Sequence, residues 1–461
     1  MNGTCALVLG LGRFGGGIEA IRFLHRRGYH VRIADKSNGA DLLASQTALA
    51  DLPGLDWQLG REDDRLLDGV RLLVINPAVP NEHPLLQAAL QRGIACTQEV
   101  NLFLEHYPGR VIAITGTNGK STTTTLIHAA LQHSGLSAIV GGNIGYSLLS
   151  CEAQWHKDQI AVLEISSFQL ERTDPAKHRV HGAVVTRVQK DHIDRHKTLS
   201  NYHAAKARIA LLATEFLVHA ADDPVAAAFA SSARQRVQFT SEPPAEGSMG
   251  CVDGWLCARL TAAPAIRLLH QNALRLLGDF QRENVLAAAA AALLIGAFAH
   301  AASLALATAK PLPFRLQLLT MLQGVRIYDN GISTEIESTR SALRTLTGRI
   351  HWLGGGKSKD GDFATVANGV APFIASAHLF GAAQQPLAAC LKDRVPVTTH
   401  DHLADALAAA LAVAKPGDAV LFSPAFASFD QYPNFRARAL EFHQRIDALQ
   451  KGTVHAAGSA D

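Results

Sequence analysis

Residues 110–136 read RVIAITGTNGKSTTTTLIHAALQHSGL, and this stretch decides the fold of the middle of the chain. Five apolar or β-branched residues at 111–115 predict a buried strand. The glycines of GTNGKST, at 116–122, then allow a tight turn that presents consecutive backbone N–H groups. The residues that follow predict a helix whose N-terminus points at the same place. Strand, turn and helix in this order predict a phosphate-binding loop.

The polar residues of this turn have predicted roles in binding a nucleoside triphosphate. Lys120 supplies a point cation for the β- and γ-phosphates, and the hydroxyl of Ser121 or Thr122 can hold Mg²⁺. The spacing GxxGK is shorter than the usual GxxxxGK[ST], and a glycine turn before a helix is also common as plain structure. The lysine, the hydroxyls, the strand and the helix in one register favour ATP or GTP binding over that alternative.

The composition bounds the size and class of the protein. Its 461 residues are too many for one hydrophobic core, and this length indicates about three domains. The net charge is only +3, and the basic residues are dispersed, which argues against nucleic acid as a partner. Six cysteines without a CxxC pair predict free thiols in a reducing compartment. Without a secretory signal or an apolar run of roughly 20 residues, we expect a cytoplasmic protein that does not insert into membranes.

A second glycine turn lies near the start of the chain. Residues 6–17, ALVLGLGRFGGG, carry Gly10, Gly12 and Gly15 in the GxGxxG spacing, and the strand predicted at 31–35 ends in Asp35. This is the fingerprint of a dinucleotide-binding turn, but the same turn suits any ligand with a diphosphate. A tight strand–helix turn without a ligand remains the alternative.

Two segments after the phosphate loop carry carboxylates at predicted strand ends. Glu164 ends an apolar strand at 160–164, where it would face the ligand crevice of a parallel sheet or cap a helix. Residues 189–196, QKDHIDRH, place two carboxylates and two imidazoles together, which predicts a metal or acid–base cluster or, alternatively, a solvated loop. Oxygen ligands suit Mg²⁺, whereas imidazole suits Zn²⁺ or Mn²⁺. The helix predicted at 202–212 would place Lys206 on the face that starts near this loop.

The rest of the chain continues the alternation of strands and helices. Short alternating segments at 237–268 predict an antiparallel sheet edge, and a proline-containing linker near 311 leads to a third domain with strands near 325–330, 350–356 and 419–425. We therefore expect an α/β protein of three domains. These are an N-terminal Rossmann-like domain at 1–107, a central P-loop ATPase-type domain with a mostly parallel sheet at 108–311, and a C-terminal Rossmann-like domain at 312–461.

Together these motifs resemble the ATP-dependent Mur ligases, and most closely the branch of that family that adds D-glutamate. The segments ITGTNGKST, GGNIG, LEISSFQLE, DHIDRH, YHAAKARI, LGGGKSKDGDF and LFSPAFASFDQYPNF fall in the family's order over nearly the whole chain. The resemblance implies three domains that bind a UDP moiety, ATP and an amino acid. It also implies that an acyl phosphate forms on UDP-N-acetylmuramoyl-L-alanine and that the amine of D-glutamate attacks it. We expect a monomer.

The resemblance also implies a role for each matching residue. The ATP set comprises Gly116, Thr117, Asn118, Gly119, Lys120, Ser121, Thr122, Gln281, Asn284, Arg315 and Asn330. The UDP-substrate set comprises Gly12, Arg13, Phe14, Asp35, Asn76 and Asn143, and the amino-acid set comprises Thr334, Lys359, Ser428 and Phe435. The implied Mg²⁺ ligands are Ser121, Glu164, His192 and Lys206, the last as a CO₂ adduct (a carbamate). The implied catalytic residues are Lys120, Glu164, His192 and Lys206.

Several positions depart from the family pattern. Phe280 and Phe314 stand where many members have histidine, and Asn330 takes the place of an aspartate. Ile332 replaces a lysine beside the amino-acid site, which leaves open whether the acceptor is D-glutamate, L-glutamate or another acidic amino acid. Lys359, or Lys357 if the glycine loop is one residue longer, still fits the family's lysine for a glutamate carboxylate.

Three other interpretations compete with this one. A folylpolyglutamate synthase-like ligase would share the fold, but the N-terminal GxGxxG domain and the SPAFASFDQ segment favour the muramoyl branch. A dinucleotide-dependent sensor or oxidoreductase would use Gly10, Gly12 and Asp35, although no catalytic pair for hydride transfer is visible. A non-catalytic nucleotide-binding scaffold would explain the lost lysine and histidines.

Overall fold

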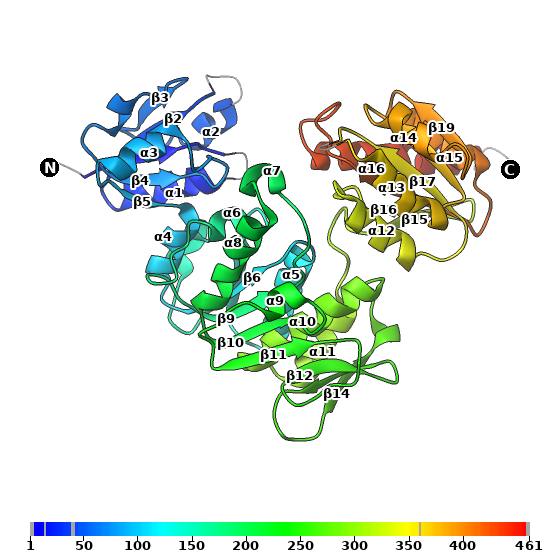
Figure 1. Ribbon diagram of the computed structural model, residues 1–461, viewed down its shortest axis with the longest axis horizontal. Coiled ribbons are helices and arrows are strands. Elements are labelled where there is room, and N and C mark those ends of the chain that lie inside the picture. The colour runs from blue at the N-terminus through cyan, green and yellow to red at the C-terminus, as the bar shows by residue number, and fades with distance from the viewer. Residues whose placement is uncertain (1–3, 13–14, 38–41, 359–360, 458–461) are drawn as a thin grey trace. The chain divides into compact units, whose positions relative to one another are not determined.

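The computed structural model describes residues 4–12, 15–37, 42–358 and 361–457. The strands of these residues form three sheets, of five, nine and six strands in chain order, with helices packed on them (Figure 1). The chain divides into two compact units: Met1–Leu274 with Glu283–Ala309, and Arg275–Arg282 with Lys310–Asp461. The predicted α/β fold with mostly parallel sheets is confirmed.

The first sheet belongs to the first unit, and all its strands are parallel. Its order is β3-β2-β1-β4-β5. The strands are β1 Cys5–Leu9, β2 His30–Asp35, β3 Asp56–Leu59, β4 Val70–Ile75 and β5 Ala95–Thr97; the helices are α1 Gly16–Arg26, α2 Leu43–Ala48, α3 Pro84–Gln91 and α4 Glu99–His106. The chain order reverses beside β1, so the ligand crevice of such a sheet lies at the carboxyl ends of β1 and β4.

The second sheet, also in the first unit, has the order β14-β13-β12-β11-β10-β9-β6-β8-β7. Its strands are β6 Arg110–Thr115, β7 Ala138–Gly142, β8 Ile160–Glu164, β9 Val180–Val185, β10 Ala213–Ala220, β11 Gln235–Phe239, β12 Ser248–Val252, β13 Trp255–Arg259 and β14 Ile266–His270. Its helices are α5 Lys120–His133, α6 Ser167–Leu170, α7 Ile193–His196, α8 Leu199–Leu212, α9 Pro224–Ala227, α10 Asp279–Leu294 and α11 Ala299–Thr308. Helices cover both faces of β6 and β8, which explains why these strands are apolar throughout.

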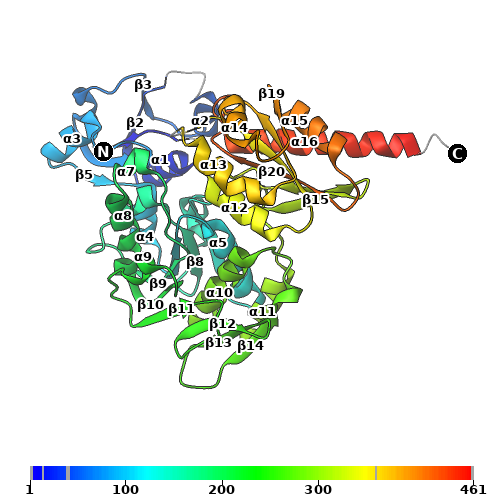
Figure 2. The same cartoon turned by 45° about the vertical axis from the view of Figure 1, so that its right-hand side comes forward.

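The far edge of this sheet is only partly antiparallel. Strands β9 to β14 lie side by side, each next to the strand that follows it in the chain (Figure 2). The expected antiparallel pairing within 237–268 is confirmed for β12, β13 and β14, whereas β11 pairs in parallel with both β10 and β12. The prediction was therefore wrong for β11, because its alternating pattern fixes which face is buried but not the direction of its neighbours.

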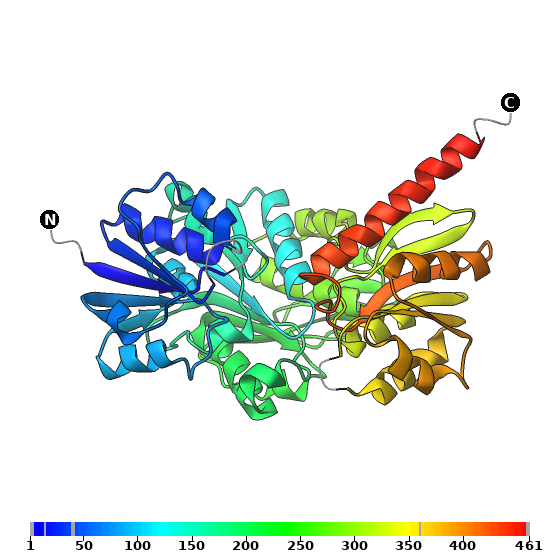
Figure 3. The ribbon, with the colours of Figure 1, turned by 90° about the horizontal axis from the view of Figure 1, so that it is seen from above.

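The third sheet forms the second unit, in the order β15-β16-β20-β17-β18-β19. Its strands are β15 Gln317–Leu322, β16 Val325–Asp329, β17 Ile350–Gly355, β18 Ser376–Phe380, β19 Val397–His400 and β20 Ala419–Ala425; its helices are α12 Ile336–Thr345, α13 Phe363–Val370, α14 Gln384–Leu391, α15 Leu403–Val413 and α16 Phe435–Ala457. Only β15 pairs antiparallel within the described part of this sheet. The long α16 packs on the sheet near its start and extends past it toward the C-terminus (Figure 3).

Two further properties of the described chain bear on the sequence predictions. None of the helices formed by these residues is both long and apolar enough to span a membrane. All six cysteines are free thiols, and only Cys257 is fully buried.

A carboxyl–hydroxyl contact joins the first two sheets of the first unit. Glu99 begins α4 and accepts a hydrogen bond from the hydroxyl of Ser147, in the loop after β7. Burial, only partly offset by this bond, raises the pKa of Glu99 to about 7. Because the unfolded chain releases this proton at lower pH than the folded chain does, the contact loses stability as the pH rises from about 4.5 to 7.

We predict that Glu99→Gln abolishes this pH dependence while keeping an acceptor for Ser147. At pH 8 the variant should be more stable than the wild type by about 1–2 kcal/mol, and this difference should become small as the pH falls to 5. Thermal melting of both proteins followed by circular dichroism between pH 5 and 8 measures this. A difference that stays constant across that range would show that the carboxyl proton is not involved.

Candidate active site

The phosphate loop joins β6 to α5, as the sequence predicts. Gly116 has φ 150° and Gly119 has φ 84°, conformations that favour glycine. A Cβ atom at Gly116 would lie 1.9 Å from Oγ1 of Thr186, and one at Gly119 would lie 2.2 Å from Oδ1 of Asn284. Neighbouring side chains therefore leave no room for a Cβ atom at either position, so both positions require glycine.

Residues from β9 and α8 hold this loop from outside. Oγ1 of Thr186 donates to the carbonyl of Asn118 at 2.5 Å. The hydroxyls of Thr117 and Tyr202 are hydrogen bonded at 2.8 Å. Thr186 and Tyr202 were not included in the site predicted from the sequence. For Thr186 the sequence offers one signal, a threonine directly after a buried strand, and for Tyr202 it offers none.

Lys120 lies over the loop that precedes it. Its Nζ donates to the carbonyls of Gly116 at 2.9 Å and Thr117 at 2.7 Å. Ser121 and Thr122 are buried in the first turn of α5, whose N-terminus carries the positive end of the helix dipole. Backbone N–H groups, an amine and two hydroxyls together are what a triphosphate requires, so the residues present fit ATP.

Lys206 is buried beside the same loop. Its side chain is 2 % exposed, and its Nζ donates to the carbonyl of Gly116 at 2.7 Å. Burial, and next the neighbouring Lys120, lower the pKa of Lys206 well below its usual value, while Asp191 and Glu164 offset part of the effect. A neutral amine is the form that reacts with CO₂, so this environment fits a carbamate.

Glu164 ends β8 with its carboxylate buried. One oxygen accepts from Nδ2 of Asn143 at 2.8 Å, and the other, Oε2, is buried without a hydrogen-bond partner in the described part of the chain. A buried, unsatisfied carboxylate oxygen is costly unless a ligand completes it. Together with the hydroxyls of α5 it forms an oxygen donor set that fits Mg²⁺.

The segment 189–196 does not close into a metal cage. His192 has φ 52° and lies outside α7, with its Nε2 3.3 Å from Oδ2 of Asp191. His196 is buried and its Nε2 lies 3.0 Å from the hydroxyl of Ser167. Over the described residues, no three His, Cys, Asp or Glu side chains come together to hold a metal ion. The metal cluster expected from two carboxylates and two imidazoles of this segment therefore does not form among the described residues, while Asp191 affects Lys206.

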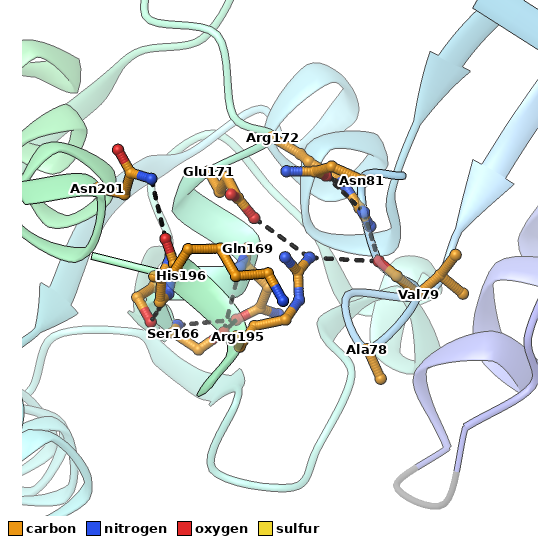
Figure 4. A network of polar contacts seen from close by, with 12 residues as sticks. Ala78, Val79, Asn81, Ser166, Gln169, Glu171, Arg172, Arg195, His196 and Asn201 are labelled. Carbon is orange, nitrogen blue, oxygen red and sulfur yellow. Dashed lines mark hydrogen bonds and ion pairs between the residues drawn. The ribbon is translucent and has the colours of Figure 1, made fainter. Parts of the chain in front are cut away.

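Arg172, which follows α6, and Arg195, in α7, both bond to the loop after β4 of the first sheet (Figure 4). The guanidinium of Arg172 donates to Oδ1 of Asn81 at 2.8 Å and to the carbonyl of Val79 at 2.5 Å. Arg195 donates to the same carbonyl at 3.3 Å and pairs with Glu171 at 3.3 Å. The loop after β4 is thereby attached to α6 and α7.

Of the predicted UDP-substrate residues, Gly12, Asp35 and Asn76 lie at the carboxyl ends of β1, β2 and β4, whereas Asn143 follows β7 of the second sheet. A Cβ atom at Gly12 would lie 2.3 Å from Nδ2 of Asn76, and Oδ2 of Asp35 accepts from the backbone N of Leu11 at 3.0 Å. The other oxygen of Asp35 accepts from the N of Ser37 at 2.9 Å, so this carboxylate also shapes the glycine turn. Arg13 and Phe14 lie outside the described residues.

The remaining ATP candidates are divided between the two units. Asn284, in the first unit, accepts from Oγ1 of Thr123 at 3.4 Å, next to the start of α5. Gln281 and Arg315 belong to the second unit. Asn330, in the same unit, accepts from the N of Leu316 at 3.2 Å and donates to Ser423 at 3.0 Å, so its amide braces the sheet.

In the second unit the amino-acid candidates follow β17 and β20. The turns after these strands are joined by backbone hydrogen bonds between Lys357 and Ala427, at 2.8 and 3.2 Å. This brings exposed Lys357 and buried Ser428 onto neighbouring turns. Phe435 begins α16, and Thr334 lies before α12. Lys359 lies outside the described residues.

Comparison with known proteins finds a family domain over each of the three sheets. The Mur ligase MurD-like N-terminal domain matches residues 4–98, the Mur ligase middle domain matches 114–292, and the Mur ligase glutamate ligase domain matches 314–426. The chain belongs to the Mur ligase family.

Two relatives of similar length are both named as D-glutamate ligases. The UDP-N-acetylmuramoylalanine--D-glutamate ligase of Acidobacterium capsulatum is 33% identical, over 97% of this chain and 96% of its own. The ligase of the same name from Geobacter metallireducens is 34% identical, over 98% of this chain and 99% of its own. Among solved structures, the UDP-N-acetylmuramate-alanine ligase of Thermotoga maritima is similar in fold, with a TM-score of 0.60 at 16% identity over 96% of this chain and 99% of that one.

We predict that Lys206 binds CO₂ as a carbamate. The uncharged amine adds to CO₂ and releases one proton, which yields a carboxylate beside the phosphate loop. Carbon-13 NMR in ¹³C-bicarbonate should show a carbamate resonance in the wild type and none in Lys206→Arg, whose guanidinium cannot form the adduct. Lys206→Ala should be inactive in phosphate release and should regain activity with added short carboxylates. A wild-type spectrum identical to that of the arginine variant would disprove the adduct.

Proposed function

We propose that this protein is an ATP-dependent ligase that adds D-glutamate to UDP-N-acetylmuramoyl-L-alanine, a cytoplasmic step in the synthesis of peptidoglycan precursors. The supporting similarity is the 33–34% identity, over at least 96% of both chains, to ligases with that name. The observation that carries the proposal is the convergence of Lys120, Lys206 and Glu164 on one glycine loop. We propose a monomer that uses ATP and Mg²⁺.

The reaction divides into two displacements. The terminal carboxylate of the UDP substrate attacks the γ-phosphorus of ATP, ADP leaves, and an acyl phosphate forms. The amine of glutamate then attacks the acyl carbon, phosphate leaves, and the amine loses a proton as the amide forms. Both steps depend on positioning and on the stabilisation of phosphate charge.

The residues of the first unit provide that positioning. Lys120 and the N-terminus of α5 stabilise charge on the β- and γ-phosphates as it develops. Glu164 and His192, with Ser121 and a carbamate on Lys206, are the proposed ligands of Mg²⁺, which when bound neutralises phosphate charge. Asn143 lies in the turn after β7 and donates from its backbone N and its side chain to Glu164, which ends the neighbouring strand β8. From this turn it can also contact the UDP substrate.

The UDP moiety has a separate proposed site in the first sheet. Gly12 and Asn76 let the diphosphate approach the backbone at the end of β1, as in other glycine turns of this type. Arg172 fixes the carbonyl of Asn76 at 3.2 Å, so the attachment in Figure 4 also supports this crevice. In the second unit, Lys357 or Lys359, Thr334, Ser428 and Phe435 are the proposed contacts of the amino acid.

We predict that Lys120→Ala abolishes turnover and leaves the fold intact. The substitution removes the amine that lies over the loop carbonyls and that would sit between the β- and γ-phosphates. A loss of at least 10²-fold in phosphate release is expected, since donors aimed at developing charge commonly contribute this much. The exposed Lys177→Ala is the matched control and should retain wild-type rates. Near wild-type release by a folded Lys120→Ala protein would remove the role assigned to this loop.

A panel of acceptors tests the proposed function directly. With ATP and UDP-N-acetylmuramoyl-L-alanine, kcat/KM should be highest for D-glutamate, lower for L-glutamate and lowest for D-glutamine and L-lysine. Because Ile332 replaces the lysine of the family pattern, we expect a higher KM for D-glutamate than in ligases that have this lysine. Preference for D-glutamine or L-lysine would overturn the acceptor class, whereas preference for L-glutamate would change only its handedness.

A further inference from the structure

Arg438 is a buried cation that forms no ion pair with a carboxylate among the described residues. It lies in the first turn of α16 and is 0 % exposed. Its Nη1 donates to the carbonyl of Gly355 at 3.3 Å and its Nη2 to that of Phe426 at 3.0 Å. Its Nε is buried without a hydrogen bond, and none of the described carboxylates forms an ion pair with the guanidinium.

This placement is unfavourable for the folded protein taken by itself. A buried guanidinium loses its hydration, and two carbonyls replace only part of it. The N-terminal turn of a helix adds the positive end of the helix dipole. Burial lowers the pKa of Arg438 to about 10, so the side chain remains charged at neutral pH. Asp430, the nearby acid that opposes this shift, accepts from the N of Ala382 at 2.9 Å instead of pairing with Arg438.

The guanidinium lies beneath the turns that carry the amino-acid candidates. Gly355 ends β17 two residues before Lys357, and Phe426 follows β20 two residues before Ser428. Contact with the first turn is tight, because a Cβ atom at Gly356 would lie 2.8 Å from Nη1. These are carboxyl ends of parallel strands, where α/β sheets bind their ligands.

We propose that Arg438 determines specificity for an acidic acceptor: its buried charge gives these two turns the positive potential that attracts the acceptor's side-chain carboxylate. Arg438 stays bonded to the two carbonyls and acts through the turns that Lys357 and Ser428 occupy. This inference rests on the proposed function, because it concerns the same amino-acid site. It also explains how the site selects an acid although Ile332 contributes no charge.

The test compares two acceptors of equal shape and different charge. Phosphate release is measured with ATP, UDP-N-acetylmuramoyl-L-alanine and either D-glutamate or D-glutamine, and the ratio of the two kcat/KM values is the readout. Arg438→Met and Arg438→Gln remove the charge, and Arg438→Lys keeps it with fewer hydrogen bonds. Arg436→Met, an exposed arginine of the same helix turn, is the matched control. Thermal melting shows which variants fold.

The two neutral variants should lower the D-glutamate to D-glutamine ratio at least tenfold. Arg438→Lys should keep the ratio within about threefold of the wild type even if both rates fall, and Arg436→Met should change neither. If the folded neutral variants lose activity equally with both acceptors, Arg438 is only a brace between the turns and the inference is wrong. If neither neutral variant folds, Arg438→Lys decides: a kept ratio supports the role of charge and a lost ratio overturns it.

Failure of the proposed function would be visible separately. A wild-type protein that prefers a neutral amino acid contradicts the ligase assignment before any variant is made. A wild-type protein that prefers D-glutamate, with an unchanged ratio in the neutral variants, contradicts only the role of Arg438.

Discussion

The active end of the first unit depends on one backbone carbonyl, that of Gly116, which accepts hydrogen bonds from two lysines. Lys120 reaches it at 2.9 Å and Lys206 at 2.7 Å. Two ammonium groups that share one carbonyl repel each other where water is excluded. Burial, and next the neighbouring Lys120, lower the pKa of Lys206 well below its usual value. A single geometric constraint thus favours the neutral form of the amine at Lys206.

This constraint is maintained by the sheet rather than by the loop. Because β6 is flanked by β8 and β9, its carboxyl end is adjacent to Glu164 on one side and Thr186 on the other. Thr186 fixes the loop, and Glu164 offers an unsatisfied oxygen next to it. Parallel order therefore accounts for the arrangement: residues 164 and 186 reach the loop only because the strands that precede them point the same way.

Local patterns in the sequence were enough to predict the elements, but not the partners of their side chains. The glycine turns, the strand that ends in Glu164 and the α/β class all follow from short-range periodicity. Tyr202 was missed, because only the docking of α8 gives it a role. His192 and His196 were expected to belong to one metal or acid–base cluster with two carboxylates, or to a solvated loop. A positive φ places His192 outside α7, and burial turns His196 toward Ser167. Such outcomes depend on long-range packing, which no window of sequence contains.

Asp329 and Arg438, two fully buried charged side chains of the second unit, have different surroundings, and the difference bears on the proposed substrate. Asp329, at the end of β16, is 0 % exposed and accepts from Nε2 of His443 at 2.6 Å. Burial raises the pKa of Asp329, and the bond from His443 partly opposes that shift, so this charge is compensated within the protein. Arg438 is equally buried, and among the described residues no carboxylate forms an ion pair with it; Asp430 offsets only part of the effect of its burial. The sheet therefore pairs Asp329 with a histidine but leaves Arg438 without an ion pair beneath the turns that we propose bind the amino acid. An acidic ligand would reduce this imbalance, whereas a neutral or basic one would not.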